Sequence, residues 1–141
     1  MAIDRVAENR RMVVVGLGQT GYSCVRYLCS KGFDVAVVDS RENPPGAADL
    51  RRDFPQVSLN AGSLDVDILL SAGEIVLSPG VALAEPELQQ ARKEGIPIVG
   101  DIDLFCRVVS QPIVAITGSN AKSTVTELVG LMARESGLKV K

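Results

Sequence analysis

Residues 12–39 read MVVVGLGQTGYSCVRYLCSKGFDVAVVD, the pattern of a strand, a glycine turn, a helix and a second strand. The apolar, mostly β-branched runs at 12–15 and 35–38 are typical of buried strands. Between them, apolar and small residues recur at helical spacing, and Gly32 follows as a helix-ending glycine. A strand, a helix and a second parallel strand form a βαβ unit, so the sequence predicts one here.

The turn at residues 16–21 has the spacing G-x-G-x-x-G. The first glycine permits a tight turn, the second lets a ligand approach the backbone, and the third allows close packing of helix and strand. N–H groups at the helix start favour an anion, and Asp39 after the second strand can accept hydrogen bonds from a hydroxyl group. The pattern predicts a site for a nucleotide diphosphate, not necessarily NAD; the alternative is a turn that only packs the corner.

Two further stretches fall at the carboxyl ends of predicted strands, which form the ligand edge of an open α/β sheet. Ser40 and Arg41 follow the second strand. Arg41 is there either to pair with a phosphate or as a solvated loop charge. Residues 78–81, Ser-Pro-Gly-Val, follow the apolar run 74–77. They are either a simple turn or a second set of backbone N–H groups beside the first glycine loop.

The remaining residues up to about 109 alternate between helix and strand patterns. We expect helices at 47–53, 85–94 and 101–109, a short edge strand at 57–59, and strands at 74–77 and 96–99. The last of these contains a proline, which indicates its start or an edge position, and residues 64–72 are ambiguous. After a charged, mobile lead-in at 1–11, this alternation predicts a Rossmann-like, doubly wound parallel sheet over residues 1–108.

Composition limits the possible functions of the 141 residues. Hydrophobic residues make up 46% of the chain and aromatic residues only 4%, which suits a parallel sheet with an aliphatic core. A net charge of −2 gives no field for nucleic acid, and no run is long enough for a membrane helix. The lack of histidine removes the usual general base. Cys24, Cys29 and Cys106 form no C-x-x-C pair, and Cys24 and Cys29 fall on the inferred buried face of the first helix, which favours core packing in a reducing cytoplasm.

A second loop follows the apolar run 113–116. Residues 117–124 read TGSNAKST and lead into a helical pattern that Gly137 closes. Strand, loop, Lys-Ser/Thr and helix is the order of a phosphate loop, in which the backbone cradles phosphates and Lys122 neutralises them. The hydroxyl group at position 123 or 124 can then reach Mg²⁺. The alternative is a turn with a serine or threonine helix N-cap.

This second loop departs from the general pattern G-x-x-x-x-G-K-[ST], because Ile116 and Ala121 occupy its glycine positions. If position 121 needs a positive φ, alanine costs on the order of 1 kcal/mol. If phosphate must approach closely, the methyl group intrudes. We interpret residues 109–141 as the start of a truncated ATP-binding domain, since more sheet and a second carboxylate for Mg²⁺ would be needed. Residues after about Ser110 are therefore expected to be mobile or to pack non-natively.

Together, five motifs in one order resemble the bacterial Mur ligases over nearly the whole chain from Met12 onward. They are GLGQTGYS at 16–23, DSR at 39–41, SPGVAL at 78–83, GDIDLF at 100–105 and TGSNAKST at 117–124. The resemblance is to the branch that adds D-glutamate to UDP-N-acetylmuramoyl-L-alanine in the cytoplasm, during peptidoglycan synthesis. It implies a ligase that uses ATP and Mg²⁺ to activate the substrate carboxylate, with small-molecule substrates as its partners.

The resemblance also implies two sets of binding residues. The residues at the UDP part of the substrate would be Gln19, Thr20, Gly21, Asp39, Ser40, Arg41 and Gly80. The residues at the ATP phosphates would be Gly118, Ser119, Asn120, Ala121, Lys122, Ser123 and Thr124, with Ser123 at Mg²⁺. No NAD is expected. The catalytic residues of the family would lie outside these 141 residues, so we expect this stretch alone to have no ligase activity.

Two other functions stay open at this point. The βαβ unit at 12–39 alone also fits the NAD-binding domain of an oxidoreductase, although the Lys-Ser-Thr loop counts against that function. The short chain and the missing histidine also fit a non-catalytic nucleotide-sensing module.

Overall fold

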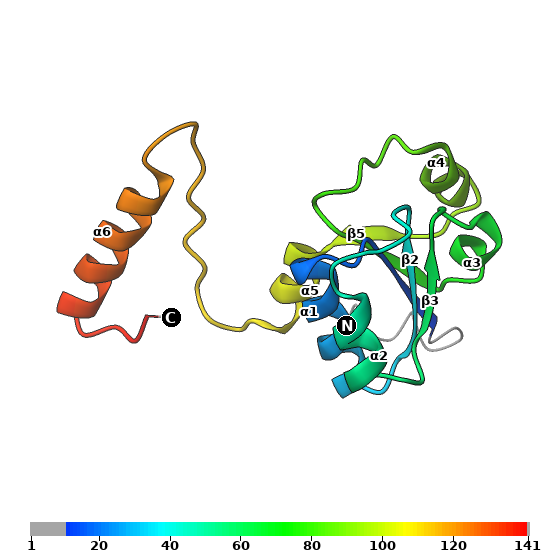
Figure 1. Ribbon diagram of the computed structural model, residues 1–141. Coiled ribbons are helices and arrows are strands. Elements are labelled where there is room, and N and C mark those ends of the chain that lie inside the picture. The colour runs from blue at the N-terminus through cyan, green and yellow to red at the C-terminus, as the bar shows by residue number, and fades with distance from the viewer. Residues whose placement is uncertain (1–10, 141) are drawn as a thin grey trace. The chain divides into compact units, whose positions relative to one another are not determined.

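The computed structural model describes residues 11–140, which fall into two compact units with the boundary between Val109 and Ser110. The first unit contains strands and helices in alternation, and the second contains one long helix (Figure 1). Of the lead-in expected at residues 1–11, all but Arg11 lies outside the described residues.

A five-stranded parallel sheet with the order β3-β2-β1-β4-β5 forms the centre of the first unit. In the middle strand, Val13 lies opposite Ala36 on one side and Ile75 on the other. The two outer strands are β3 and β5, in agreement with the edge positions expected from the sequence. The elements of this unit are β1 (Arg11–Val15), α1 (Gln19–Ser30), β2 (Asp34–Asp39), α2 (Ala47–Asp53), β3 (Ser58–Ala61), α3 (Val66–Leu70), β4 (Glu74–Leu77), α4 (Pro86–Lys93), β5 (Ile98–Gly100) and α5 (Asp101–Val108).

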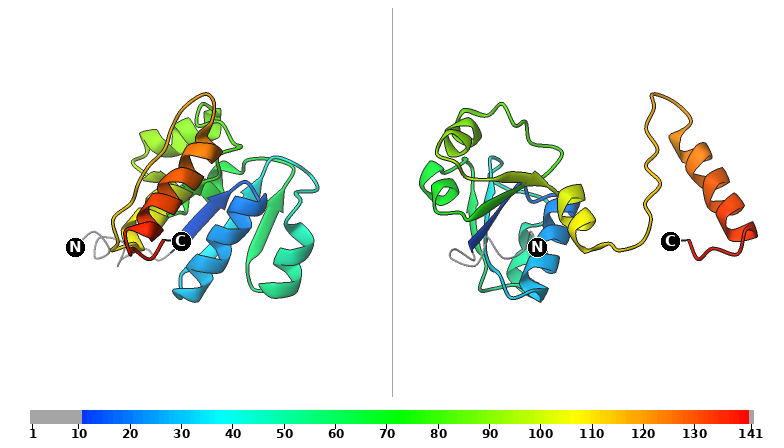
Figure 2. Two further views of the ribbon diagram at one scale, coloured as in Figure 1. Left: turned by 90° about the vertical axis from the view of Figure 1, so that its left-hand side faces the viewer. Right: turned by 180° about the vertical axis from the view of Figure 1, so that it is seen from behind.

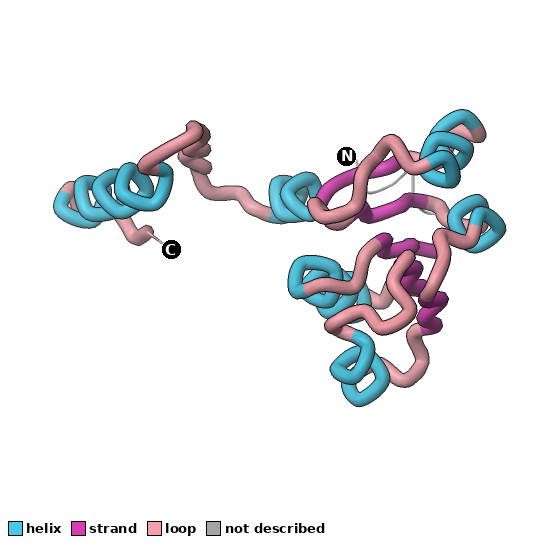
Figure 3. The backbone as a smooth tube through the Cα atoms, turned by 45° about the horizontal axis from the view of Figure 1, so that its top comes forward, coloured by secondary structure: helices cyan, strands magenta, loops and turns pink. Residues whose placement is uncertain are grey.

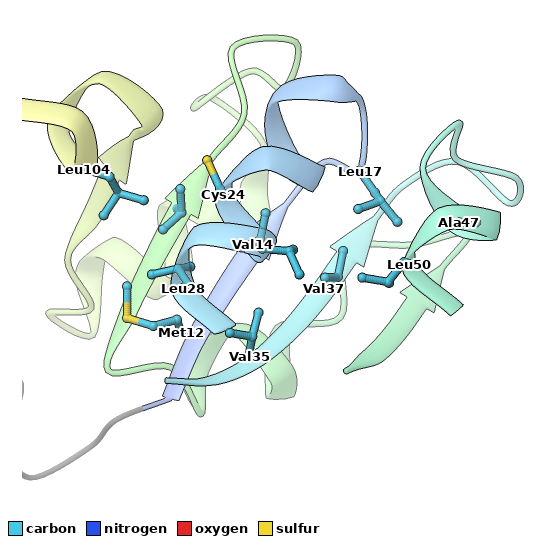
Figure 4. Close-up of a cluster of buried hydrophobic side chains, with 12 residues drawn as sticks. Met12, Val14, Leu17, Cys24, Leu28, Val35, Val37, Ala47, Leu50 and Leu104 are labelled. Carbon is cyan, nitrogen blue, oxygen red and sulfur yellow. The ribbon is translucent and has the colours of Figure 1, made fainter. Parts of the chain in front are cut away.

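Helices cover both faces of this sheet (Figure 3). Successive residues of a strand point to opposite faces, so Met12 and Val14 belong to one buried cluster and Val13 and Val15 to the other. Helices α1, α2 and α5 pack on the first face, whose side chains are drawn in Figure 4. Helices α3 and α4 pack on the second face. The doubly wound α/β fold expected from the sequence is confirmed.

The ambiguous stretch 64–72 contains the short helix α3. Asp65 caps this helix, because its carboxylate accepts hydrogen bonds from the N–H groups of Asp67 and Ile68 at 2.9 and 3.1 Å. Leu69 is fully buried against the second face of the sheet. A helix of this length has too few residues to show helical periodicity, so the capping aspartate is its main sequence signal.

The second unit contains helix α6 (Lys122–Glu135), which is followed by Gly137 with a φ of +82°. The strand expected at 113–116 is not formed. A strand needs a neighbouring strand to satisfy its backbone hydrogen bonds. The part of this unit that the structure describes contains no strand with which residues 113–116 could pair. Figure 2 shows α6, in orange to red, as the regular element after α5.

Candidate functional site

The carboxyl ends of β1 and β4 lie next to each other at the centre of the sheet. The chain leaves β1 toward β2 on one side, whereas β4 and β5 lie on the other side, so the strand order reverses here. Ligands of open α/β sheets bind in the crevice at such a switch point. Both strands lead into a glycine turn at this place, residues 16–21 after β1 and residues 78–81 after β4.

The glycines of the 16–21 turn have different surroundings. Gly16 has a φ of +90°, and a Cβ there would lie 2.9 Å from a Val81 methyl carbon. A Cβ on Gly21 would lie 1.9 Å from the Gly16 carbonyl oxygen, so α1 can pass this close to the turn only with glycine at that position. At Gly18, no atom of the described chain lies within 4 Å of an added Cβ. The turn is therefore closed on its inner side and open to a ligand at Gly18.

Ser78 connects the second glycine turn to the first. This residue is 9% exposed, and its hydroxyl donates a hydrogen bond of 2.8 Å to the Gly16 carbonyl oxygen. Its N–H donates to the Val15 carbonyl oxygen at 3.0 Å. Gly80 is exposed, and within the described chain an added Cβ there would also meet no atom within 4 Å. The two turns thus lie side by side, each with an open glycine.

Asp39 ends β2 at the same edge and is only 2% exposed. Its carboxylate accepts hydrogen bonds from the Leu17 N–H at 2.6 Å, and from the N–H and guanidinium of Arg41 at 2.6 to 2.9 Å. Burial acts to raise the pKa of this carboxyl, but the hydrogen bonds outweigh it and lower the pKa below its usual value. The carboxylate is therefore ionised and engaged by the protein itself, whereas the sequence suggested a direct contact with a ligand hydroxyl.

The residues expected at the UDP part all belong to this edge of the sheet: Gln19, Thr20, Gly21, Asp39, Ser40, Arg41 and Gly80. Gln19 and Thr20 form the first turn of α1, where backbone N–H groups have no partner inside the helix. Ser40 and Arg41 are exposed just beyond the end of β2. The fold thus places backbone donors in the middle of the edge and a cationic side chain to one side of it.

A cavity of about 470 Å³ lies between α1 and α5, which pack side by side (Figure 2). Gln19 and Thr20 line it from the start of α1, and Leu104 and Phe105 line it from α5. Sequence reasoning missed this cavity, because its existence depends on how the two helices are spaced. Cys24 also lines it and belongs to the buried cluster on this face of the sheet, and burial raises the pKa of the Cys24 thiol, which favours its neutral form.

The loop at 117–124 leads into α6 of the second unit. Ala121 has a φ of +60°, and it is the one non-glycine residue with a positive φ among residues 11–140. The position therefore has the conformation that glycine tolerates best, and alanine costs on the order of 1 kcal/mol there. The Lys122 ammonium donates to the Gly118 carbonyl oxygen, and residues 123 and 124 lie in the first turn of α6. The residues expected at the ATP phosphates therefore belong to one loop–helix junction.

Two kinds of site are not found in the part of the chain that the structure describes. None of its helices combines the length and the apolar character that crossing a bilayer requires. Its Cys, Asp and Glu side chains form no group of three or more that could hold a metal ion.

The sequence matches one described family and several curated proteins. Residues 10–100 match the family described as Mur ligase MurD-like, N-terminal domain. A UDP-N-acetylmuramoylalanine--D-glutamate ligase of Pseudomonas syringae is 55% identical over 135 residues, which make up 96% of this chain and 30% of that protein. The chain therefore spans about a third of the length of such relatives.

Two solved structures are similar to this chain as well. A pseudomurein peptide ligase type C from Methanothermus fervidus is 28% identical with a TM-score of 0.60, covering 93% of this chain and 27% of that one. UDP-N-acetylmuramate-alanine ligase MurC from Thermotoga maritima is 25% identical with a TM-score of 0.58, covering 88% of this chain and 29% of that one.

Proposed function

The chain belongs to the Mur ligase family, in its MurD-like branch, and on that premise we propose that its first unit binds the UDP part of UDP-N-acetylmuramoyl-L-alanine. The observation that supports this proposal best is the pair of open glycines, Gly18 and Gly80, in two turns that lie side by side at the switch point of the sheet. Two open backbone segments let a diphosphate approach N–H groups closely.

In this proposal, the diphosphate lies at the start of α1 and at the second turn. Gln19, Thr20 and Gly21 supply N–H groups from the first helical turn, and Gly80 supplies backbone from the other side. These donors and the partial positive charge of the helix start act locally on the anion. A net charge of −2 provides no global attraction, so this local set carries the recognition.

The uridine end lies over the residues that follow β2. Arg41 is exposed on its outer side, while its guanidinium is held by the buried Asp39 carboxylate. Ser40 is exposed next to it and has a hydroxyl that can donate or accept. We assign Asp39 to this end because its carboxylate binds the Arg41 guanidinium and so keeps this cation at the edge of the site.

The second loop is proposed to bind the phosphates of ATP, with Mg²⁺ at Ser123. The backbone of residues 118–121, the Lys122 ammonium and the hydroxyls of residues 123 and 124 are the groups available to them. The left-handed conformation at Ala121 supports this assignment, because strained backbone that is kept in a loop is often functional. ATP would supply the phosphoryl group that activates a carboxylate for amide formation.

We propose that the protein carrying these residues adds D-glutamate to UDP-N-acetylmuramoyl-L-alanine in the cytoplasm. The named relatives are UDP-N-acetylmuramoylalanine--D-glutamate ligases, and similarity to them extends over 96% of this chain. The chain corresponds to 30% of such a relative, so the groups proposed here bind and orient nucleotides, and the amide-forming step is assigned to the whole protein.

A calorimetric titration of this chain with UDP-N-acetylmuramoyl-L-alanine, UDP and NAD tests the proposal for the first unit. We expect both uridine ligands to bind and NAD not to bind. Arg41→Ala should weaken the uridine ligands, whereas Arg52→Ala should not, because Arg52 is an exposed arginine paired with Asp49 and Asp53 of α2. Clear binding of NAD without the uridine ligands would favour the NAD-binding domain of an oxidoreductase instead.

A further inference from the structure

Both polar groups of the peptide between Gly16 and Leu17 are held by buried side chains. The carbonyl oxygen of this peptide accepts a hydrogen bond from the Ser78 hydroxyl at 2.8 Å. The N–H of the same peptide donates to the Asp39 carboxylate at 2.6 Å. Ser78 is 9% exposed and Asp39 is 2% exposed, so neither bond competes freely with water.

The two side chains reach this peptide from opposite sides of β1. Asp39 ends β2 and Ser78 follows β4, and these strands are the two neighbours of β1 in the sheet. Gly16, with a φ of +90° and no Cβ, permits rotation of the peptide that most residues would prevent. The two hydrogen bonds therefore hold this peptide in one orientation.

This peptide packs directly against the first turn of α1. The Gly16 carbonyl oxygen occupies the space in which a Cβ of Gly21 would lie, at 1.9 Å. If this peptide turned, the oxygen would leave the space beside Gly21, and the N–H groups of residues 18–21, which follow this peptide in the chain, would shift with it. These are the groups that the proposed function assigns to the diphosphate.

We infer that Ser78 is a positioning residue for the nucleotide-binding loop. Its hydroxyl and the Asp39 carboxylate fix the peptide between Gly16 and Leu17, and so aim the N–H groups of residues 18–21 at the diphosphate. The ligand named here rests on the proposed function. The positioning itself rests on the hydrogen bonds alone.

The test compares UDP with uridine as probes for Ser78→Ala, Ser78→Thr and Ser71→Ala. Ser71 is a matched control, because its hydroxyl also donates to a backbone carbonyl, that of Ile68 at 2.6 Å, but in α3. We expect Ser78→Ala to weaken UDP at least tenfold and to change uridine less than twofold. Ser78→Thr, which keeps the hydroxyl, should bind UDP within threefold of the unchanged chain, and Ser71→Ala within twofold.

Two results would overturn the inference: UDP affinity within twofold of normal in Ser78→Ala, or an equal loss for UDP and uridine. The second result would show a general structural effect instead of loop positioning. Hydrogen exchange separates this inference from the proposed function. If the unchanged chain binds neither probe, the proposed function fails. Hydrogen exchange of the Leu17 amide then tests whether Ser78 positions the loop. Exchange at least tenfold faster in Ser78→Ala than in Ser71→Ala supports positioning, and unchanged exchange refutes it.

Discussion

Replacing Gly21 with alanine should destabilise the first unit, although it adds only one methyl group. The new Cβ would lie 1.9 Å from the Gly16 carbonyl oxygen, a distance that real Cβ atoms do not tolerate. The oxygen would have to move by more than an ångström. That movement would disturb its 2.8 Å hydrogen bond from Ser78 and the peptide that it shares with Leu17.

The expected loss follows from two opposing effects. Overpacking a buried site costs about 1–3 kcal/mol and occasionally more, and contact with backbone puts this site at the upper end. Alanine inside a helix gains about 1 kcal/mol over glycine. The net loss is therefore about 2 kcal/mol, which lowers the Tm of a unit of this size by about 10 °C.

Gly18→Ala is the matched control for this prediction. Gly18 has an ordinary extended conformation, with a φ of −88°, and no described atom lies within 4 Å of an added Cβ. We expect a Tm within about 2 °C of that of the unchanged chain, because alanine is allowed in this conformation and reduces the conformational entropy of the unfolded chain. UDP should bind more weakly, because the methyl group stands where the ligand is proposed to approach the backbone. Thermal unfolding followed by circular dichroism measures both variants. A Gly21→Ala variant as stable as Gly18→Ala would refute the packing argument.

Three further predictions concern charge and backbone strain. The low pKa of Asp39 means that its contribution to stability is present above about pH 4 and is lost as the pH falls further. Asp39→Asn should therefore lower the Tm at pH 7 and make the Tm fall less steeply between pH 7 and pH 3. A variant whose Tm falls with pH as steeply as that of the unchanged chain would contradict this. Arg107→Ala should lower the free energy of unfolding, measured in urea, by about 2 kcal/mol, because it leaves the buried Glu74 carboxylate without its two 2.7 Å hydrogen bonds. The exposed control Arg52→Ala should lower it by less than about 1 kcal/mol. Equal losses in the two variants would refute a special role of the buried pair. Ala121→Gly should slow hydrogen exchange of the Val125 amide, which donates to the carbonyl oxygen of residue 121 at 2.9 Å, about fivefold, because it removes about 1 kcal/mol of strain from the folded loop. Faster exchange of this amide would contradict the prediction.

The alternation of strands and helices in the first unit could be predicted because short stretches of sequence indicate each element by themselves. The apolar run before Gly16 and the glycine after α1 mark element ends without reference to the rest of the chain. The strand expected at 113–116 shows the limit of such patterns, because a strand also needs a neighbour in space. The general phosphate-loop pattern has a glycine at the position of Ala121, so the sequence indicates that this position could need a positive φ, but not that it has one.

The sequence predicts which residues belong to the candidate site, and this assignment stays a prediction, whereas it does not predict the contacts between them. Asp39 was identified from its place after β2, yet its hydrogen bonds to Leu17 and Arg41 depend on how three segments meet. The sequence marks Ser78 as part of the 78–81 turn and of the SPGVAL motif, but it does not indicate its hydrogen bond, because the accepting carbonyl group is 62 residues away in the chain. Such contacts come from tertiary packing, which neither periodicity nor spacing encodes.

The most direct test of the central claim is an amide chemical-shift titration of this chain with UDP, with NAD as the comparison. We expect UDP to shift the amides of residues 18–21 and Gly80 most strongly, and NAD to leave them unchanged. Shifts of the same amides by NAD but not by UDP would contradict a UDP site in the two glycine turns.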